Sequence, residues 1–151
     1  MPYPASERLR IGRYSERGRL YLLTCVVRDR EPLFGDLKLA RLVVQQLRAA
    51  QTEGAVESLA WVVMPDHVHW LVQLNEITLD VLMRRFKARS ALHINRARHS
   101  RGRLWQSGFH DRALRREEDL RAVARYIIAN PLRAGLVSKV GDYPHWDAIW
   151  L

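Results

Sequence analysis

The sequence of 151 residues contains a single cysteine, Cys25, and this scarcity excludes several structures. One cysteine cannot form an internal disulfide or a multi-cysteine zinc site. Cys25 lies in an apolar run, so we expect a buried, inert thiol in a strand. No stretch approaches the roughly 20 apolar residues that a transmembrane helix requires, and the polar N-terminus has no apolar signal-peptide core. These absences predict a soluble protein of the cytoplasm.

Acidic residues are few relative to basic ones. The chain has 25 Lys and Arg against 16 Asp and Glu, which gives a formal net charge of +9. Almost all of the excess is arginine, whose planar guanidinium suits phosphate recognition better than lysine does. This charge favours a polyanionic partner such as nucleic acid, or an anionic membrane surface. Basic ribosomal proteins share this property, so charge alone does not identify an enzyme.

Hydrophobic periodicity predicts the order of the secondary-structure elements. Strands are expected over residues 20–27, 56–64, 67–74 and 105–114, and helices over 37–52, 78–97 and 117–130. The order βαββαβ followed by one more helix is that of a ferredoxin-like α+β fold. In this fold an antiparallel sheet carries two helices on one face. The other face is left for a ligand or for the additional C-terminal helix.

The length of the chain fits one compact domain. Nearly half of its residues are hydrophobic, at 48%, so a chain of this size can bury a substantial core. We expect three parts, a basic N-terminal arm, the folded domain and a C-terminal tail, over residues 1–18, 19–137 and 138–151.

Two histidines occupy alternate positions of the strand expected over 67–74. Alternate side chains of a strand share a face, so His67 and His69 point one way, and Val68 and Trp70 point into the core under the helices. Two imidazoles on an open sheet face can bind one cation together. Two polar residues on the wet face of a strand would produce the same pattern, so both interpretations stay open.

Tyr126 and Asn130 lie one turn apart on the flank of the helix expected over 117–130. A helix packed on a sheet presents this flank to a cleft. Each residue also has a simpler interpretation: Tyr126 as a boundary aromatic with its hydroxyl in water, and Asn130 as the cap of a turn that begins at Pro131. Taken alone, each residue fits the simpler interpretation better.

The segment 84–103 holds eight basic residues and no acid. Helices usually intersperse opposite charges, so an unrelieved basic run indicates phosphate contacts. Trp105 and Phe109, just beyond it, could stack on unpaired bases. A solvated basic face is the simpler alternative, but it explains the absence of acids poorly.

Together these motifs resemble the REP-associated tyrosine transposases, a branch of the single-tyrosine HUH transposase superfamily. The resemblance runs from about Gly18 to Trp146 and is carried by residues 20–24, 64–69, 86–87, 94–95, 104–112, 126–127 and 130–137. Two positions depart from the family. Asp66 stands where Asn is common, and we expect no effect because the side chain sits in a turn. The start of the first strand, Gly18-Arg19-Leu20-Tyr21, lacks the family's Gly-Thr-Tyr or Gly-Ser-Tyr, in a loop implicated in reading DNA.

The resemblance implies an active site. His67 and His69 would be metal ligands, Tyr126 the nucleophile, and Asn130 the third ligand on the tyrosine's helix. The implied reaction is cleavage of a DNA strand through a 5′-phosphotyrosine, assisted by Mg²⁺ or Mn²⁺. His110 or Asp111, on the expected fourth strand, would support the site. Ordinary surface polarity is the alternative for both residues.

The family acts on single-stranded DNA folded into the imperfect hairpins of repetitive extragenic palindromes, in the bacterial cytoplasm. The basic arm, residues 1–18, and the basic segment 84–103 are the candidates for binding this DNA. The expected contacts are Arg84, Arg85, Lys87, Arg89, Arg96, Arg112 and Trp105. A monomer is favoured, although related transposases exchange a tyrosine helix within a dimer.

Three alternatives to a transposase remain at this point. The first is a domesticated hairpin-binding module that cleaves little. The second is a metal-dependent phosphodiesterase of small substrates that does not use Tyr126. The third is a ribosome-associated basic protein.

Overall fold

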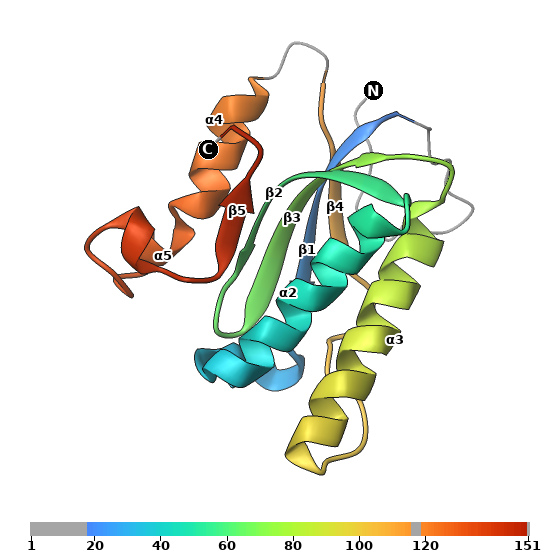
Figure 1. The fold of residues 1–151 in the computed structure, drawn as a ribbon, viewed down its shortest axis with the longest axis vertical. Coiled ribbons are helices and arrows are strands. Elements are labelled where there is room, and N and C mark those ends of the chain that lie inside the picture. Colours follow the sequence, from blue (N-terminus) through green and yellow to red (C-terminus); the bar gives the residue numbers. More distant parts are fainter. Residues whose placement is uncertain (1–17, 116–118, 151) are drawn as a thin grey trace.

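A computed structural model describes residues 18–115 and 119–150 and contains a five-stranded antiparallel sheet (Figure 1). The strands lie in the order β4-β1-β3-β2-β5. Their bounds are Leu20–Val26 (β1), Val56–Val63 (β2), His67–Leu74 (β3), His110–Ala113 (β4) and Trp146–Ala148 (β5). The first four strands, with their two helices, follow the ferredoxin-like order. The predicted α+β class is therefore confirmed.

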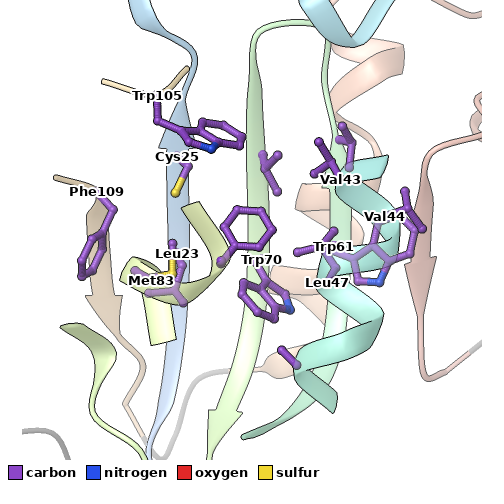
Figure 2. Close-up of a cluster of buried hydrophobic side chains, with 14 of the residues drawn as sticks. Leu23, Cys25, Val43, Val44, Leu47, Trp61, Trp70, Met83, Trp105 and Phe109 are labelled. Carbon is purple, nitrogen blue, oxygen red and sulfur yellow. The ribbon is translucent and has the colours of Figure 1, made fainter. Parts of the chain in front are cut away.

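Two helices, α2 (Leu37–Thr52) and α3 (Leu79–Arg98), pack side by side on one face of the sheet (Figure 1). Each begins at a capping side chain: Asp36 accepts hydrogen bonds from two backbone N–H groups of α2, and Thr78 accepts one from α3. Their apolar stripes and the inner face of the sheet form the main core, in which Leu23, Leu47 and Trp70 are buried (Figure 2). Among the described residues, no helix combines the length and apolarity needed to cross a membrane.

A second core lies on the opposite face, under α4 (Leu120–Ile128), which is followed in the chain by α5 (Asn130–Arg133). Ala124 and Ile127 of α4 pack there with Leu71 of β3. The helix expected over 117–130 begins at Leu120, capped by Asp119; residues 116–118 lie outside the described part. The free face of the sheet is therefore occupied by the additional helix.

The segment 138–150, expected as part of a tail, contributes to the sheet. Trp146–Ala148 pairs with β2, and Tyr143 and Ala148 are buried in the second core. The Tyr143 hydroxyl donates to the carbonyl of Val63. A strand of three residues is too short for a period-two pattern to reveal, so the expectation of a tail is corrected here.

The strand expected over 105–114 is shorter than predicted, since only His110–Ala113 forms β4. Trp105 makes an isolated bridge to Val27, and Gly108 turns the chain with a φ of 72°. The ammonium of Lys87 donates to the carbonyls of Gln106 and Gly108, at 2.8 and 2.6 Å. This loop therefore depends on a contact with α3 that the local sequence does not show.

Candidate active site

Strand pairing places both histidines on the sheet face that carries α4. Thr24 of β1 lies opposite His69 of β3 on one side and His110 of β4 on the other. Opposite residues of an antiparallel pair point to the same face, so these three side chains form a row across three strands. Val68 and Trp70 point to the other face and are buried in the main core. The predicted alternation is confirmed.

Asp66 holds the ring of His67. The distance from His67 Nδ1 to Asp66 Oδ1 is 2.7 Å, and Arg30 donates to Asp66 Oδ2 at 3.0 Å. Burial alone would raise the pKa of Asp66, but the hydrogen bonds from His67 and Arg30 outweigh it and lower that pKa. The carboxylate is ionised near neutral pH and can only accept, so Nδ1 of His67 donates and Nε2 is not part of this hydrogen bond. The Asp66 side chain therefore reaches the histidine pair from its turn, and the expectation that Asp in place of Asn has no effect stays a prediction.

His69 is held by Thr24, whose Oγ1 lies 2.8 Å from Nδ1. Burial, together with the neighbouring His67 and Arg133, lowers the pKa of His69 to about 4. The ring is therefore neutral near pH 7, which is the form that binds metal ions. The two histidine rings lie 4.8 Å apart between centroids, at 78° to each other. With Nδ1 engaged by Thr24, Nε2 is left for a ligand, so the pair fits a metal ion.

Tyr126 lies on the flank of α4, as predicted, and is 65% exposed. The guanidinium carbon of Arg133 lies 3.8 Å from the centroid of its ring. Such a cation–π contact is worth about 0.5–1 kcal/mol at an exposed position. The charge of the same arginine lowers the pKa of His69. Arg133 thus contacts the ring of Tyr126 within one chain.

Asn130 is the first residue of α5 and lies one turn beyond Tyr126, half-buried. Within residues 119–150 no side chain caps α5, so the structure does not support a capping role for Asn130. The described residues contain no group of three His, Cys, Asp or Glu that could hold a metal ion. A third protein ligand would have to be of another type, such as an amide oxygen. The assignment of Asn130 as this ligand stays a prediction.

The residues expected to support the site fall on two faces of β4. His110 lies opposite Thr24 and Arg112 opposite Leu22, on the face of the histidine pair. Asp111 lies opposite Leu23, which points into the main core, so it lies on the other face. The register therefore favours His110 over Asp111 as a supporting residue.

Trp105 and Phe109 are part of the core and are not free to stack on bases (Figure 2). Trp105 is 2% exposed, its Nε1 donates to Ser90 Oγ at 3.0 Å, and its ring contacts Phe34 and Phe86. The predicted DNA contact of Trp105 is therefore wrong. An aromatic residue beside a basic run can equally close the core, and the local pattern does not distinguish the two.

The basic surface is smaller than predicted because other segments supply acids to it. Arg89 donates to both carboxylate oxygens of Glu53 at 2.8 Å, and Arg98 pairs with Glu31 at 3.4 Å. The remaining predicted arginines are exposed: Arg84, Arg85, Arg96 and Arg112. The predicted basic arm lies outside the described residues except for Gly18.

Thr24, Asp66 and Arg133 are site residues to which the sequence analysis assigned no role. Thr24 could have been found by aligning the first and third strands, because it lies opposite His69. Arg133 follows Tyr126 by seven positions but lies on a separate helix, α5, so the spacing alone does not reveal the contact. Asp66 is next to His67, but its position in a turn concealed its contact with the ring.

Comparisons with known proteins identify relatives of this chain. The family model described as "Transposase IS200 like" matches residues 19–130. A REP-associated tyrosine transposase of Escherichia coli K12 is 30% identical over 138 residues, which cover 87% of this chain and 78% of the relative. A Haemophilus influenzae protein, provisionally described as a REP-associated tyrosine transposase, is 28% identical over 144 residues, covering 85% of this chain and 79% of the relative.

A solved structure of a REP-associated tyrosine transposase bound to a REP hairpin superposes with a TM-score of 0.74 at 24% identity. The match covers 97% of this chain and 81% of the other. At this identity the match shows that the two proteins share a fold.

Proposed function

This chain belongs to the IS200-like transposase family, with REP-associated tyrosine transposases among its relatives, and from this premise we propose that it cuts and rejoins single-stranded DNA beside hairpins. One observation carries the proposal. His67 and His69 are both oriented through Nδ1 on the sheet face that is covered by α4, the helix of Tyr126. The hairpin bound to the solved relative supports a DNA hairpin as the partner.

We propose that His67, His69 and the amide oxygen of Asn130 hold a divalent cation. Two neutral nitrogen donors and one oxygen suit Mn²⁺ by ligand softness, and Mg²⁺ where it is abundant. When bound, the ion would polarise a phosphate oxygen and offset the negative charge that develops in the transition state. The orientation of both rings by Asp66 and Thr24 supports this ligand set.

The nucleophile of the proposed reaction is Tyr126. Its Oη attacks phosphorus, the Oη–P bond forms, and the bond between phosphorus and the 3′-oxygen breaks. The phenolic proton passes to solvent, and the 3′-oxygen takes up a proton to become a free 3′-OH. Attack by another 3′-OH reverses these changes and joins strands without a nucleotide cofactor. The exposure of Tyr126 leaves room for a DNA strand to approach it.

The same arrangement favours a site that is complete within one chain. Ala124 and Ile127 of α4 pack with Leu71 of β3, on the face of the histidine pair, so the helix of Tyr126 lies on the sheet of its own chain. A monomer therefore needs no helix from a second copy. For the DNA backbone we propose the exposed arginines Arg84, Arg85, Arg96 and Arg112 as contacts.

A labelled hairpin oligonucleotide with a single-stranded flank tests the proposal. The protein is incubated with it in Mg²⁺ or Mn²⁺ and the products are separated on a denaturing gel. We expect a covalent adduct that disappears with EDTA and with Tyr126→Phe. Tyr143→Phe is the matched control, because that hydroxyl serves a backbone hydrogen bond in the second core.

Two outcomes would contradict the proposal in different ways. Cleavage that survives Tyr126→Phe would overturn the assignment of the nucleophile. Hairpin binding without cleavage in either metal ion would indicate a domesticated binding module.

A further inference from the structure

Arg133 lies against the proposed nucleophile, at 3.8 Å from its guanidinium carbon to the centroid of the Tyr126 ring. Seven residues separate the two, and the chain passes from α4 into α5 between them. Ala129, at this junction, has a right-handed helical backbone, with φ −82° and ψ −1°. Ala129 ends α4 and precedes α5, so the contact joins Tyr126 on α4 to Arg133 at the end of α5.

The ring of Tyr126 has few other restraints. Its neighbours Ala124 and Ile127 are buried in the second core, whereas Tyr126 itself is largely exposed. An exposed side chain can exchange among its staggered rotamers. A nucleophile in the wrong rotamer is not aligned with phosphorus, and a misplacement of about 1 Å can cost about 100-fold in rate. A contact that holds the ring therefore has a direct effect on catalysis.

The stacked guanidinium keeps its hydrogen-bond donors available. Stacking uses the flat face of the group, while its five N–H bonds lie in the plane and point outward. Among the described residues, no carboxylate pairs with Arg133. A planar fork of this kind binds two phosphate oxygens at once.

We propose that Arg133 presents Tyr126 to the scissile phosphate, with its flat face against the phenol ring and its N–H edge against the phosphate oxygens. This inference rests on the proposed function and adds a residue to it. Lysine at this position would keep the charge but lose the flat face and the fork.

The experiment compares Arg133→Gln and Arg133→Lys with a matched control, Arg125→Gln. Arg125 is exposed, directly precedes Tyr126 and lies 4.0 Å from the carboxylate of Asp119. Two quantities are measured separately: the single-turnover rate of adduct formation at saturating hairpin, and the Kd for a hairpin with a non-cleavable linkage. We expect Arg133→Gln to lower the rate about 100-fold, Arg133→Lys to lower it less, and Arg125→Gln to leave it unchanged.

The change in Kd should be small, within about threefold, because one phosphate contact among several is lost. The rejoining rate should fall by the same factor as the cleavage rate, since both pass through one transition state. A purely structural role of Arg133 would not lower the rate of adduct formation while leaving the Kd for the hairpin almost unchanged. Wild-type rates for Arg133→Gln, or a loss confined to Kd, would overturn the inference.

The contact itself is tested without catalysis, by ¹⁹F NMR of protein labelled with 3-fluorotyrosine. The Tyr126 resonance, assigned by its loss in Tyr126→Phe, should shift in Arg133→Gln and not in Arg125→Gln. An unchanged resonance in Arg133→Gln would overturn the positioning role. If the wild-type protein forms no adduct but the resonance shifts, the proposed function has failed and only the contact stands.

Discussion

At the residue scale, the proposed metal ligands owe their orientation to Asp66 and Thr24. Asp66 is next to His67 in the chain, whereas Thr24 reaches His69 across the pairing of two strands. Outer partners of metal-binding histidines set the tautomer and the direction of the ring, and losing one typically costs 10–100-fold in affinity. Removal of either partner is therefore expected to weaken metal binding.

We predict that Asp66→Ala weakens Mn²⁺ binding by about 10- to 100-fold, because His67 loses the acceptor that fixes its Nδ1 proton. Isothermal titration calorimetry measures this directly. Asp142→Ala, which removes an exposed aspartate from the turn Val140–Asp142, is the control for the lost charge. An affinity of Asp66→Ala equal to that of the control would show that Asp66 does not orient the site.

Two histidines with a lowered pKa, His69 and His145, predict how stability depends on pH. Burial lowers the pKa of His145, which is 5% exposed, with a further contribution from Arg41. The pKa of His69 is lowered to about 4. In the unfolded chain a histidine titrates near 6.5. Below that pH the unfolded state takes up more protons than the folded state, so acid lowers stability.

We predict that the urea midpoint of the metal-free protein falls as the pH decreases from 6.5 to 4, the interval between the unfolded and folded pKa values of His69. His145→Gln should make this decline shallower, because one of the two groups no longer titrates. Urea unfolding at pH 7, 6, 5 and 4 measures both. A decline that is as steep in the variant as in the wild type would rule out a contribution from His145.

At the scale of elements, the loop between α3 and β4 is part of the core. Trp105 closes the main core next to Phe34 and Phe86, and Lys87 of α3 binds two carbonyls of this loop. The same loop carries the aromatic residues that the sequence analysis assigned to base stacking. In the structure these residues connect α3 to β1 and β4.

We predict that Trp105→Ala lowers the free energy of unfolding by about 3–5 kcal/mol, as expected for a large core aromatic. Trp105→Phe should cost less, because it keeps most of the apolar contact and loses the hydrogen bond to Ser90. Urea unfolding and hairpin affinity are measured on both variants. If Trp105→Phe has normal stability but binds the hairpin weakly, Trp105 contacts the DNA after all.

At the scale of the whole molecule, the two faces of the sheet differ in the core that each one holds and in the site residues that each one carries. The face under α2 and α3 holds the main core, whereas the face under α4 holds a smaller core beside the histidine pair. Strand β5 and Tyr143 join the C-terminal segment to that second core. The site is thus built between the sheet and the last third of the chain.

We predict that mixing two inactive variants does not restore activity. Tyr126→Phe lacks the nucleophile, and a His67→Ala, His69→Ala double variant lacks the metal ligands. If the site is complete within one chain, no mixture contains an intact site. The readout is adduct formation on the hairpin after co-incubation and after co-refolding. Adduct in the mixture would show that the tyrosine helix is exchanged between subunits.

The sequence by itself determined the elements whose signal is local. The predicted ranges for β1, α2, β2, β3 and α3 agree with the structure to within one residue at each end, because periodicity and capping residues act over a few positions. The same local rule placed His67 and His69 on one face and Tyr126 on the flank of its helix. These features need no knowledge of distant contacts.

Only the tertiary structure decided the features that depend on residues far apart in the chain. The length of β4, the presence of β5 and the burial of Trp105 each depend on neighbours from other elements. The acids that neutralise Arg89 and Arg98 come from segments outside the basic run. Two residues contact the site residues from other elements. Thr24 meets His69 through strand register, and Arg133 of α5 meets Tyr126 of α4. Side-chain contacts of this kind form only once the sheet is assembled, and that is why the composition of a segment does not reveal them.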